Sequence, residues 1–414
     1  MSSIFHLEHS LPTFQSLIFF ASSIAALLLL AALYAARSNA PPSIPLYVPE
    51  TAAAGNQKKR WMYDSVNLLQ EAYKKFNGKP FKVWTTEGNQ IAIPPDYVDE
   101  LKMLPDHTFP SALRDFFLHS YLWPIEPSKL DYGHVVMKND LNKNMGAVFP
   151  EVRDEVRIVF PLEFPDCNDW LAIQVYPKVL RLVSRVNGKI FVGSGLHQNE
   201  EWVKISCNYT RKPDKNDPHF HGISQLGIGA ASVNTTSQLI TNAIFNLATY
   251  PEYFPILKDE MDSGGHLTAT FQRKALRPIT LSDGTHIPPG TFTFSPANAI
   301  GSDPNIYPDA NTFDGLRFYN LRQASLGDEK KYQLTSITKT QMQFGSGRHA
   351  CPGRWFASHQ IKLVLAAVID RYELRLKDGE GRPKSIVFQT NQLPDPKAEI
   401  LFKNRKRGVN GGAD

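Results

Sequence analysis

The chain has 414 residues, of which 42% are hydrophobic, and a formal net charge of +5 at pH 7. This composition can fill a large core, and the length fits two or three domains or one large helical domain. The mild charge gives no support for nucleic-acid binding. The three cysteines, Cys167, Cys207 and Cys351, argue against a disulfide framework and favour a reducing compartment, and no pair has zinc-site spacing.

The N-terminal region predicts a membrane anchor. Residues 14–36 are uncharged and rich in Leu, Ala, Ile and Phe, and about 20 apolar residues span a bilayer. A cleaved signal peptide is the alternative, but its apolar core would be shorter and would follow basic residues, which are missing before the span. The positive-inside rule then places residues 1–13 in a lumen. Prolines make 37–47 a stiff hinge, and 48–414 is the predicted cytosolic domain.

Periodicity and turn residues predict a mainly helical body with small β-sheets. The predicted helices span 64–76, 94–103, 138–160, 170–186 and 223–250. The predicted strands lie at 81–86, 90–93, 270–280, 286–294 and, as a pair, within 386–402. Residues 189–202 are expected to connect two helices. The apolar segment 223–250 is interpreted as a buried central helix rather than a second membrane span, because its interior carries Ser, Asn, Gln and Thr.

The most informative stretch is 344–353, which reads Phe-Gly-Ser-Gly-Arg-His-Ala-Cys-Pro-Gly and precedes a predicted amphipathic helix. A thiolate at a helix N-terminus is stabilised by backbone N–H groups, and a thiolate is also an axial ligand of haem iron. Gly345, Gly347 and Gly353 would let the backbone pass close to a flat macrocycle. Phe344 would pack on the sulfur side of the ring, and His349 could reach a propionate. The alternative is a buried, inert cysteine beside a turn.

This loop resembles the cysteine-ligand signature of the cytochrome P-450 family, with every fixed position filled. The resemblance, to the fungal branch, implies the cytochrome P-450 fold, haem b as the cofactor and Cys351 as the ligand of its iron. It implies a monooxygenase that inserts one atom of O₂ into a C–H bond and reduces the other to water. It also implies NADPH–cytochrome P-450 reductase as the partner, a monomer, and a single-pass location in the endoplasmic reticulum membrane. Three basic residues flank the loop and could meet an acidic partner or simply be solvated, namely Arg348, Arg354 and Lys362.

The resemblance assigns further residues around the haem. In the family a long central helix crosses the distal face and carries an acid or amide followed by threonine, and Asn234 and Thr235 align with this pair. Asn234 leaves a hydrogen-bonding group but no proton source, whereas Thr235 can hold a water that relays protons; alternatively Thr235 bonds back to its own helix. Arg273 stands where the family places an arginine for a haem propionate, with an ordinary surface arginine as the alternative. Arg317, in the meander motif 313–318, normally locks the core beneath the haem.

Two segments typical of the family are missing, so the fold is expected to be internally shortened. No glutamate has an arginine three positions later, and the helix expected within 260–269 is absent. Residues 210–218 run directly to the central helix, where the family has helices that roof the substrate pocket. The chain is therefore shorter than the family by roughly a fifth. Without its partners Arg317 would be a buried unpaired charge, or it would become solvated.

The expected substrate class rests on resemblance alone. The turn 280–285 and the stretch 378–383 are similar to those of fungal ent-kaurene oxidases and indole-diterpene oxygenases, which favours a lipophilic, terpenoid secondary metabolite. Three alternatives stay open. The chain could be a haem-binding pseudoenzyme or truncated inactive product, a redox-neutral haem-thiolate isomerase or dehydratase, or a non-haem membrane adaptor. The retained Thr235 speaks against the isomerase, which needs no proton relay to O₂.

Overall fold

The computed structural model describes residues 43–49, 57–105, 107–116, 135–208, 223–254, 268–324, 326–327 and 331–405, without the side chains of 113–116 and 223–231. The predicted lumenal tail, the anchor at 14–36 and most of the hinge lie outside this range. Within the described part of the chain, no helix combines the length and apolar character that crossing a bilayer requires. The membrane anchor therefore stays a prediction.

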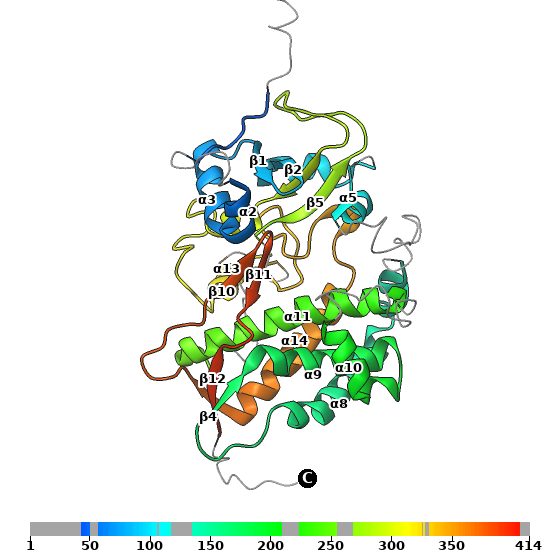
Figure 1. The fold of residues 1–414 in the computed structure, drawn as a ribbon, viewed down its shortest axis with the longest axis vertical. Coiled ribbons are helices and arrows are strands. Elements are labelled where there is room, and N and C mark those ends of the chain that lie inside the picture. The colour runs from blue at the N-terminus through cyan, green and yellow to red at the C-terminus, as the bar shows by residue number, and fades with distance from the viewer. Residues whose placement is uncertain are drawn as a thin grey trace, which may run out of the picture.

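A helical part forms the lower half of the molecule in Figure 1. Its four long helices are α8 (Met145–Glu163), α9 (Val175–Phe191), α11 (Ile223–Thr249) and α14 (Arg354–Arg371), with the shorter α10 (Glu200–Asn208) beside α9. α11 packs against α9 and α14, and α14 also packs against α8. The main hydrophobic core lies between these helices. The prediction of a buried central helix at 223–250 is thus confirmed.

A small antiparallel sheet closes the far end of the helical part, in the order β4 (Leu171–Gln174), β12 (Glu399–Asn404) and β9 (Tyr372–Arg375). The prediction of one helix over 170–186 was wrong at its start. Residues 171–174 pair with β12, which buries Ile173 against Ile400, and the helix begins only at Val175. Backbone pairing with a distant strand overrides the local pattern here.

A second part carries a five-stranded sheet in the order β1 (Phe81–Thr85), β2 (Gly88–Ala92), β8 (Phe292–Ser295), β5 (Thr270–Ala275) and β3 (His107–Thr108). β2 and β8 are parallel and the other neighbours are antiparallel. The described helices of this part are α2 (Gln57–Tyr63), α3 (Ser65–Phe76), α4 (Pro95–Leu101), α5 (Phe109–Phe116) and α12 (Ala297–Gly301). Two smaller cores lie beneath the sheet and its helices.

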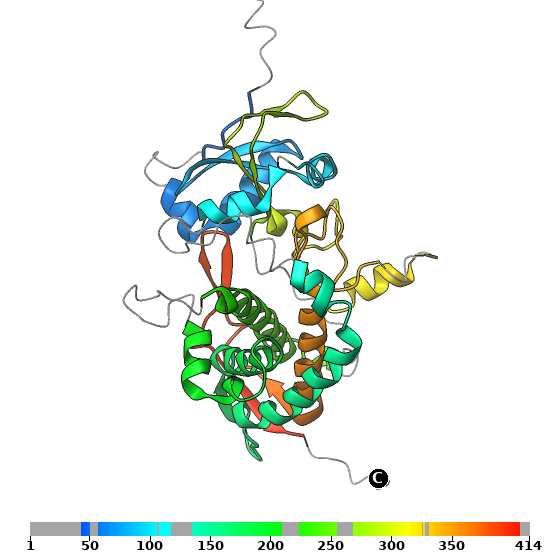
Figure 2. The same cartoon turned by 90° about the vertical axis from the view of Figure 1, so that its right-hand side faces the viewer.

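The remaining elements are η2 (Met137–Leu141), η3 (Leu196–Gln198), η6 (Pro251–Tyr253), α13 (Arg317–Gln323), η7 (Gly347–His349) and the hairpins β6–β7 (Ile279–Thr280, His286–Ile287) and β10–β11 (Ser385–Phe388, Asn391–Pro394). The hairpin β10–β11 lies between the two parts (Figures 1 and 2), where β10 packs against α2 and β11 packs against α11. The predicted helix at 138–160 is divided, because the chain turns between η2 and α8. The loop that carries Cys351 comes between these parts and leads directly into α14.

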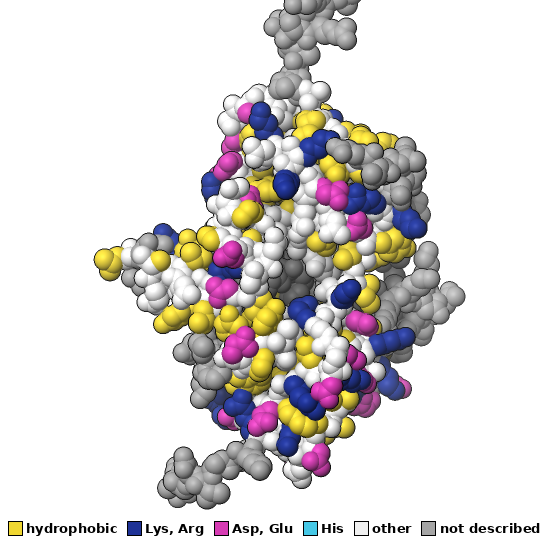
Figure 3. Space-filling view, turned by 90° about the vertical axis from the view of Figure 1, so that its left-hand side faces the viewer, with side chains coloured by type: hydrophobic (Ala, Val, Ile, Leu, Met, Phe, Trp, Pro, Cys, Tyr) yellow, Lys and Arg dark blue, Asp and Glu magenta, His cyan; other side chains and the backbone are white. Residues whose placement is uncertain are grey.

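Charged side chains of both signs are scattered over the face shown in Figure 3, which is hollowed at its centre between the two parts. No large single-sign patch stands out on this face. The mixture of charges on this face agrees with the mild net charge of the chain.

Candidate functional site

The cysteine loop is closed by its own backbone. The amide of Cys351 donates to the carbonyl oxygen of Phe344 across 2.8 Å, and the amide of Ala350 donates to that of Gly347 across 3.1 Å. Gly345 and Gly347 have positive φ angles of 71° and 69°, a region in which glycine carries no steric penalty. The predicted turning role of these two glycines is consistent with this backbone.

Neighbouring elements hold the loop in place. A Cβ atom on Gly347 would lie 2.1 Å from the carbonyl oxygen of Lys102, at the end of α4, so the loop passes this residue with no room for a side chain. Asn142, after η2, donates from Nδ2 to the carbonyl oxygen of Pro352 across 2.9 Å. Gly353 has an ordinary φ of −81°, and its smallness instead matters because a Cβ would lie 3.0 Å from Cε of Met137.

The sulfur of Cys351 lies in a mixed electrostatic environment. Burial raises the pKa of its thiol, while the backbone N–H groups of Gly353 and Arg354 and the charge of Arg354 act in the opposite direction. The helix N-terminus that the sequence suggested as a source of stabilisation is present, but burial outweighs it. A bound metal cation would reverse this balance, because a coordinating thiol is deprotonated. The site thus suits a thiolate that is completed by a cation.

Arg273 lies on β5 with 2% of its surface exposed, so the alternative of an ordinary surface arginine was wrong. Its Nη2 donates to the carbonyl oxygen of Ser346 across 2.9 Å, and its Nη1 to that of Gln272 across 2.7 Å. Its Nε has no hydrogen-bond partner among the described residues. Burial lowers its pKa to about 10. Within the described chain this buried cation has no carboxylate within salt-bridge distance.

Aromatic residues that the sequence analysis did not identify surround this guanidinium. Its carbon lies 4.5 Å from the ring centre of Phe271 and 5.5 Å from that of Phe109. The ring of Phe109 lies 6.4 Å from the ring of His349. The structure therefore brings Arg273 and His349, predicted as propionate ligands, to one place beside the cysteine loop. No sequence signal marked Phe109, because its position depends on how β3 pairs with β5.

Asn234 and Thr235 lie in α11, on the side that the neighbouring helices leave open. Asn234 is half-buried and Thr235 is exposed, whereas Val233, Thr236 and Ser237 are buried. Ser237 bonds back to its own helix, donating from Oγ to the carbonyl oxygen of Val233 across 2.7 Å. α11 packs against α14, which begins three residues after Cys351. The roles of Asn234 and Thr235 stay predictions.

Arg317 is not a buried, unpaired charge. Its guanidinium is half-buried and donates to three backbone carbonyl oxygens of the preceding loop, those of Pro308, Asp309 and Thr312. Most of 260–269 and all of 210–218, where the missing helices were expected, lie outside the described residues.

The basic residues near the loop differ from one another. Arg348 and Lys362 are exposed, as expected for a docking surface. Arg354 is half-buried, and its Nη1 donates to the carbonyl oxygen of Cys351 across 2.9 Å. Arg354 therefore supports the loop, which corrects its interpretation as a purely surface cation.

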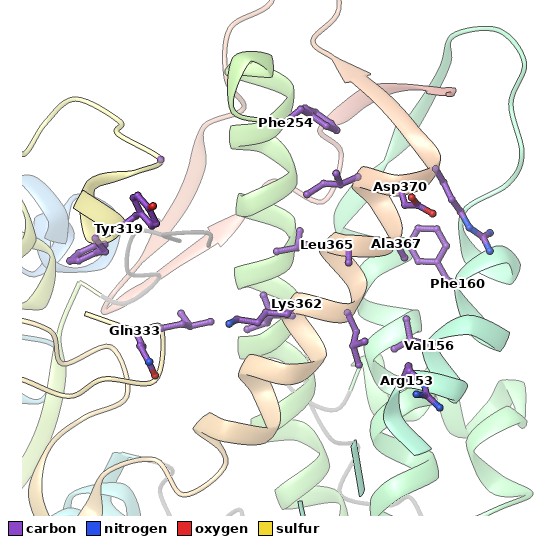
Figure 4. Close-up of a pocket in the computed structure, with 18 of the residues that line it drawn as sticks. Arg153, Val156, Phe160, Phe254, Tyr319, Gln333, Lys362, Leu365, Ala367 and Asp370 are labelled. Atoms are coloured by element: carbon purple, nitrogen blue, oxygen red, sulfur yellow. The ribbon is translucent and has the colours of Figure 1, made fainter. Parts of the chain in front are cut away.

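A cavity of about 1080 Å³ lies along the outer side of α14 (Figure 4). Its walls come from α8, from α13 and the following loop, and from Phe254, the last described residue before 268. Lys362 and Arg153 point into it together with aromatic side chains. None of the described residues that line it belongs to the 344–353 loop. The cavity is thus separate from the thiol, and it is cationic on the side that carries Lys362.

The side chains present fit a haem group. A haem carries an iron cation and two carboxylates. The loop offers a thiol with two backbone N–H groups beside it, and Arg273 offers a buried cation with an unpartnered Nε and no carboxylate partner in the described chain. Buried charges are normally paired, so Arg273 is suited to a propionate. Haem supplies the chemistry of O₂ reduction that no protein side chain performs.

Comparison with known proteins identifies the family. A model of the cytochrome P-450 family matches residues 266–402. The chain is 30% identical to cytochrome P-450 monooxygenase braC of Annulohypoxylon truncatum, over 87% of this chain and 92% of that protein. It is 25% identical to an ent-kaurene oxidase of Fusarium fujikuroi, over 84% and 85% of the two chains. The solved haem domain of cytochrome P-450DA has the same fold, with a TM-score of 0.62 and 12% identity over 88% of this chain and 98% of that one.

The alignment with braC runs over 467 positions, although this chain has only 414 residues. The relative therefore carries internal residues that this chain lacks, as the sequence analysis expected. The likeness still extends over nearly the whole of both proteins. The chain belongs to the cytochrome P-450 family, a family of haem b-dependent monooxygenases.

Proposed function

We propose that the chain is a membrane-anchored monooxygenase that oxidises a lipophilic secondary metabolite, most specifically a terpenoid. The proposal of a terpenoid rests on the similarity to ent-kaurene oxidase, at 25% identity. The anchor predicted at 14–36 would hold the catalytic domain on the cytosolic face of the endoplasmic reticulum. Such a location suits substrates that partition into membranes.

The observation that carries the proposal is the thiol of Cys351 together with the buried cation of Arg273, which β5 holds against the same loop by a bond to Ser346. We assign Cys351 as the axial ligand, because its loop places the thiol beside two backbone N–H groups and Arg354, where a bound cation would complete a thiolate. Arg273 and His349 would hold the propionates. Phe344, Gly347 and Gly353 would shape the surface on which the macrocycle lies. Thr235, with Asn234 beside it, would hold the water that passes protons towards O₂.

We assign NADPH–cytochrome P-450 reductase as the electron donor. Lys362 is exposed at the cavity along α14, and Arg153 and Arg157 line the same cavity from α8. These cations would attract an acidic flavoprotein and speed its association. A monomeric chain with one reductase bound at a time is the arrangement that we propose.

The test is a carbon-monoxide difference spectrum of the dithionite-reduced full chain in microsomes, followed by NADPH consumption with added reductase. A red-shifted Soret band of the thiolate type with NADPH consumption is the expected result. Haem binding without NADPH consumption would identify the pseudoenzyme, which the missing internal residues favour. Product formed from a terpenoid without O₂ would identify an isomerase or dehydratase. A chain that binds no haem would refute the assignment of Cys351.

A further inference from the structure

Four side chains with buried polar atoms come from α8, α9, η3 and α10, namely Glu155, Asn187, His197 and Trp202, and form a polar cluster. Nε2 of His197 and Oε1 of Glu155 lie 3.2 Å apart and form a buried ion pair when the ring is protonated. Among the described residues, Nδ1 of His197, Nε1 of Trp202 and Oδ1 of Asn187 have no hydrogen-bond partner. Buried polar atoms normally have partners, so these three need an explanation.

Gly188 on α9 lies at the centre of the cluster. A Cβ there would stand 2.9 Å from Cβ of His197 and 3.4 Å from Nε1 of Trp202. The backbone of α9 therefore approaches both polar side chains closely. Buried polar groups of this kind are normally satisfied by internal water, each molecule of which has about three partners. Ordered water at the cluster would satisfy these atoms.

One end of the cluster lies just below the protein surface. Every residue from Ser194 to Glu200 is exposed except His197, of which only 3% is exposed. His197 is thus the one inward-pointing residue of an otherwise solvated segment. Protons from bulk water have a short way to its ring.

Asn187, which precedes Gly188 on α9, joins this helix to α11. Asn187 donates from Nδ2 to Oγ of Ser232 across 2.8 Å. Ser232 precedes Thr235 by three residues, and residues so spaced are neighbours on a helix surface. Asn234 has no ionisable group, so the site needs a proton source elsewhere.

We propose that His197 and Glu155 form the outer end of a proton path that runs through ordered water, Asn187 and Ser232 to Thr235. The proposal rests on the proposed function. His197 and Glu155 exchange protons with bulk water, and the polar side chains of Asn187 and Ser232 orient the water between them and Thr235. None of these four residues contacts the reacting atoms, so each is a positioning or proton-supplying residue.

The path predicts a change in product ratio. Complete reduction of O₂ to water takes four electrons and four protons, whereas release of H₂O₂ takes two of each. NADPH supplies the electrons in both cases through the reductase. A slower proton supply to Thr235 therefore raises the amount of H₂O₂ formed per NADPH. It also makes the solvent isotope effect in D₂O larger, because proton movement becomes rate-limiting.

The experiment uses the haem-loaded full chain with reductase and no added substrate. Glu155→Gln and Asn187→Leu are compared with Glu163→Gln, which removes a buried carboxylate of α8 outside the cluster that is bound by Arg181 and Arg185. We expect both cluster variants to form about tenfold more H₂O₂ per NADPH with a larger solvent isotope effect. The Glu163→Gln ratio should match that of the wild type. Unchanged ratios in Glu155→Gln and Asn187→Leu, at equal haem content, would overturn the proposal.

A second readout does not depend on catalysis. Magnetisation transfer from water to the ring protons of His197 is measured by NMR in the same chain before haem is added. Ordered water at the cluster predicts transfer to His197 in the wild type and a smaller transfer in Glu155→Gln, with no decrease in Glu163→Gln. A dry His197 would refute the path. If the wild type consumes no NADPH but shows this transfer, the proposed function fails and the water site stands.

Discussion

Arg273 donates from Nη2 to the carbonyl oxygen of Ser346, 73 residues later in the chain. This bond ties β5 of the five-stranded sheet to the loop that carries Cys351. The cation is thereby fixed relative to the thiol, although the two residues come from different parts of the fold. A cofactor with a central metal cation and carboxylates at its edge would complement these two groups, the cation at the thiol and a carboxylate at Arg273.

Replacing Arg273 is expected to affect the haem-loaded and haem-free chains differently. In Arg273→Gln the haem loses a charged hydrogen-bond partner, which contributes about 1.5–3 kcal/mol. The haem-free chain loses a buried cation that has no carboxylate partner in the described chain, so its free energy of unfolding should fall less or even rise. Thermal unfolding with and without haem measures both effects. An equal loss in both states would show that Arg273 only supports the loop.

Replacing the thiol should remove the spectral signature. Cys351→Ala is expected to abolish the thiolate-type Soret band, because no other described cysteine lies on this loop. Cys167→Ala is the matched control, since Cys167 is also buried but lies beside β12, where its Sγ is 3.4 Å from the carbonyl oxygen of Phe402. A carbon-monoxide difference spectrum compares the two. A normal band in Cys351→Ala would contradict the assignment.

A methyl group at Gly347 should displace the loop. Gly347→Ala combines a positive φ with a Cβ only 2.1 Å from the carbonyl oxygen of Lys102. Gly379 has a similar φ of 78° but open space around it, so Gly379→Ala carries only the backbone penalty of about 1–2 kcal/mol. We expect Gly347→Ala to be less stable than this control and to lose haem, as measured by denaturant unfolding and haem content. Equal stability of the two would show that the loop and α4 can separate at little cost.

Acid should destabilise the chain through His107. Burial and the nearby charge of Arg273 lower its pKa from 6.5 to about 4, so the unfolded chain takes up the proton more readily. Stability is therefore lost as the pH falls from 6.5 towards 4, by up to about 1.4 kcal/mol per pH unit. His107 accepts or donates one bond to Oγ1 of Thr293 across 2.6 Å, which His107→Gln can keep. Urea unfolding between pH 7 and 4 should show a shallower loss in this variant, and parallel curves would refute the role of His107.

Thr235→Ala tests the proposed proton relay on α11. We expect the H₂O₂ formed per NADPH to rise about tenfold, with the Soret band unchanged. Thr236→Ala is the control, because Thr236 is the adjacent threonine and is buried rather than exposed. Measuring the peroxide formed, the NADPH consumed and the oxygen taken up gives this ratio. The same ratio in both variants would mean that Thr235 does not deliver protons.

Local sequence was sufficient to predict the elements that local forces fix. The glycines and cysteine of 344–353 predicted a tight loop, and the long apolar stretch with polar interior residues predicted α11 as a buried helix. The two-residue periodicity and turn signals placed β1 and β2. These features depend on backbone sterics and hydrophobic patterning within a few residues.

Contacts between distant segments decided the rest. Residues 171–174 form a strand because β12 pairs with them. Arg317 donates to carbonyl oxygens of the preceding loop and has no buried acidic partner among the described residues. The cluster of Arg273, Phe109 and His349 and that of Glu155, His197 and Asn187 each join several elements. The pKa values of Cys351 and Arg273 depend on how far packing removes each group from water. The burial of a side chain is a property of the packed structure, so it could not be read from the order of the residues alone.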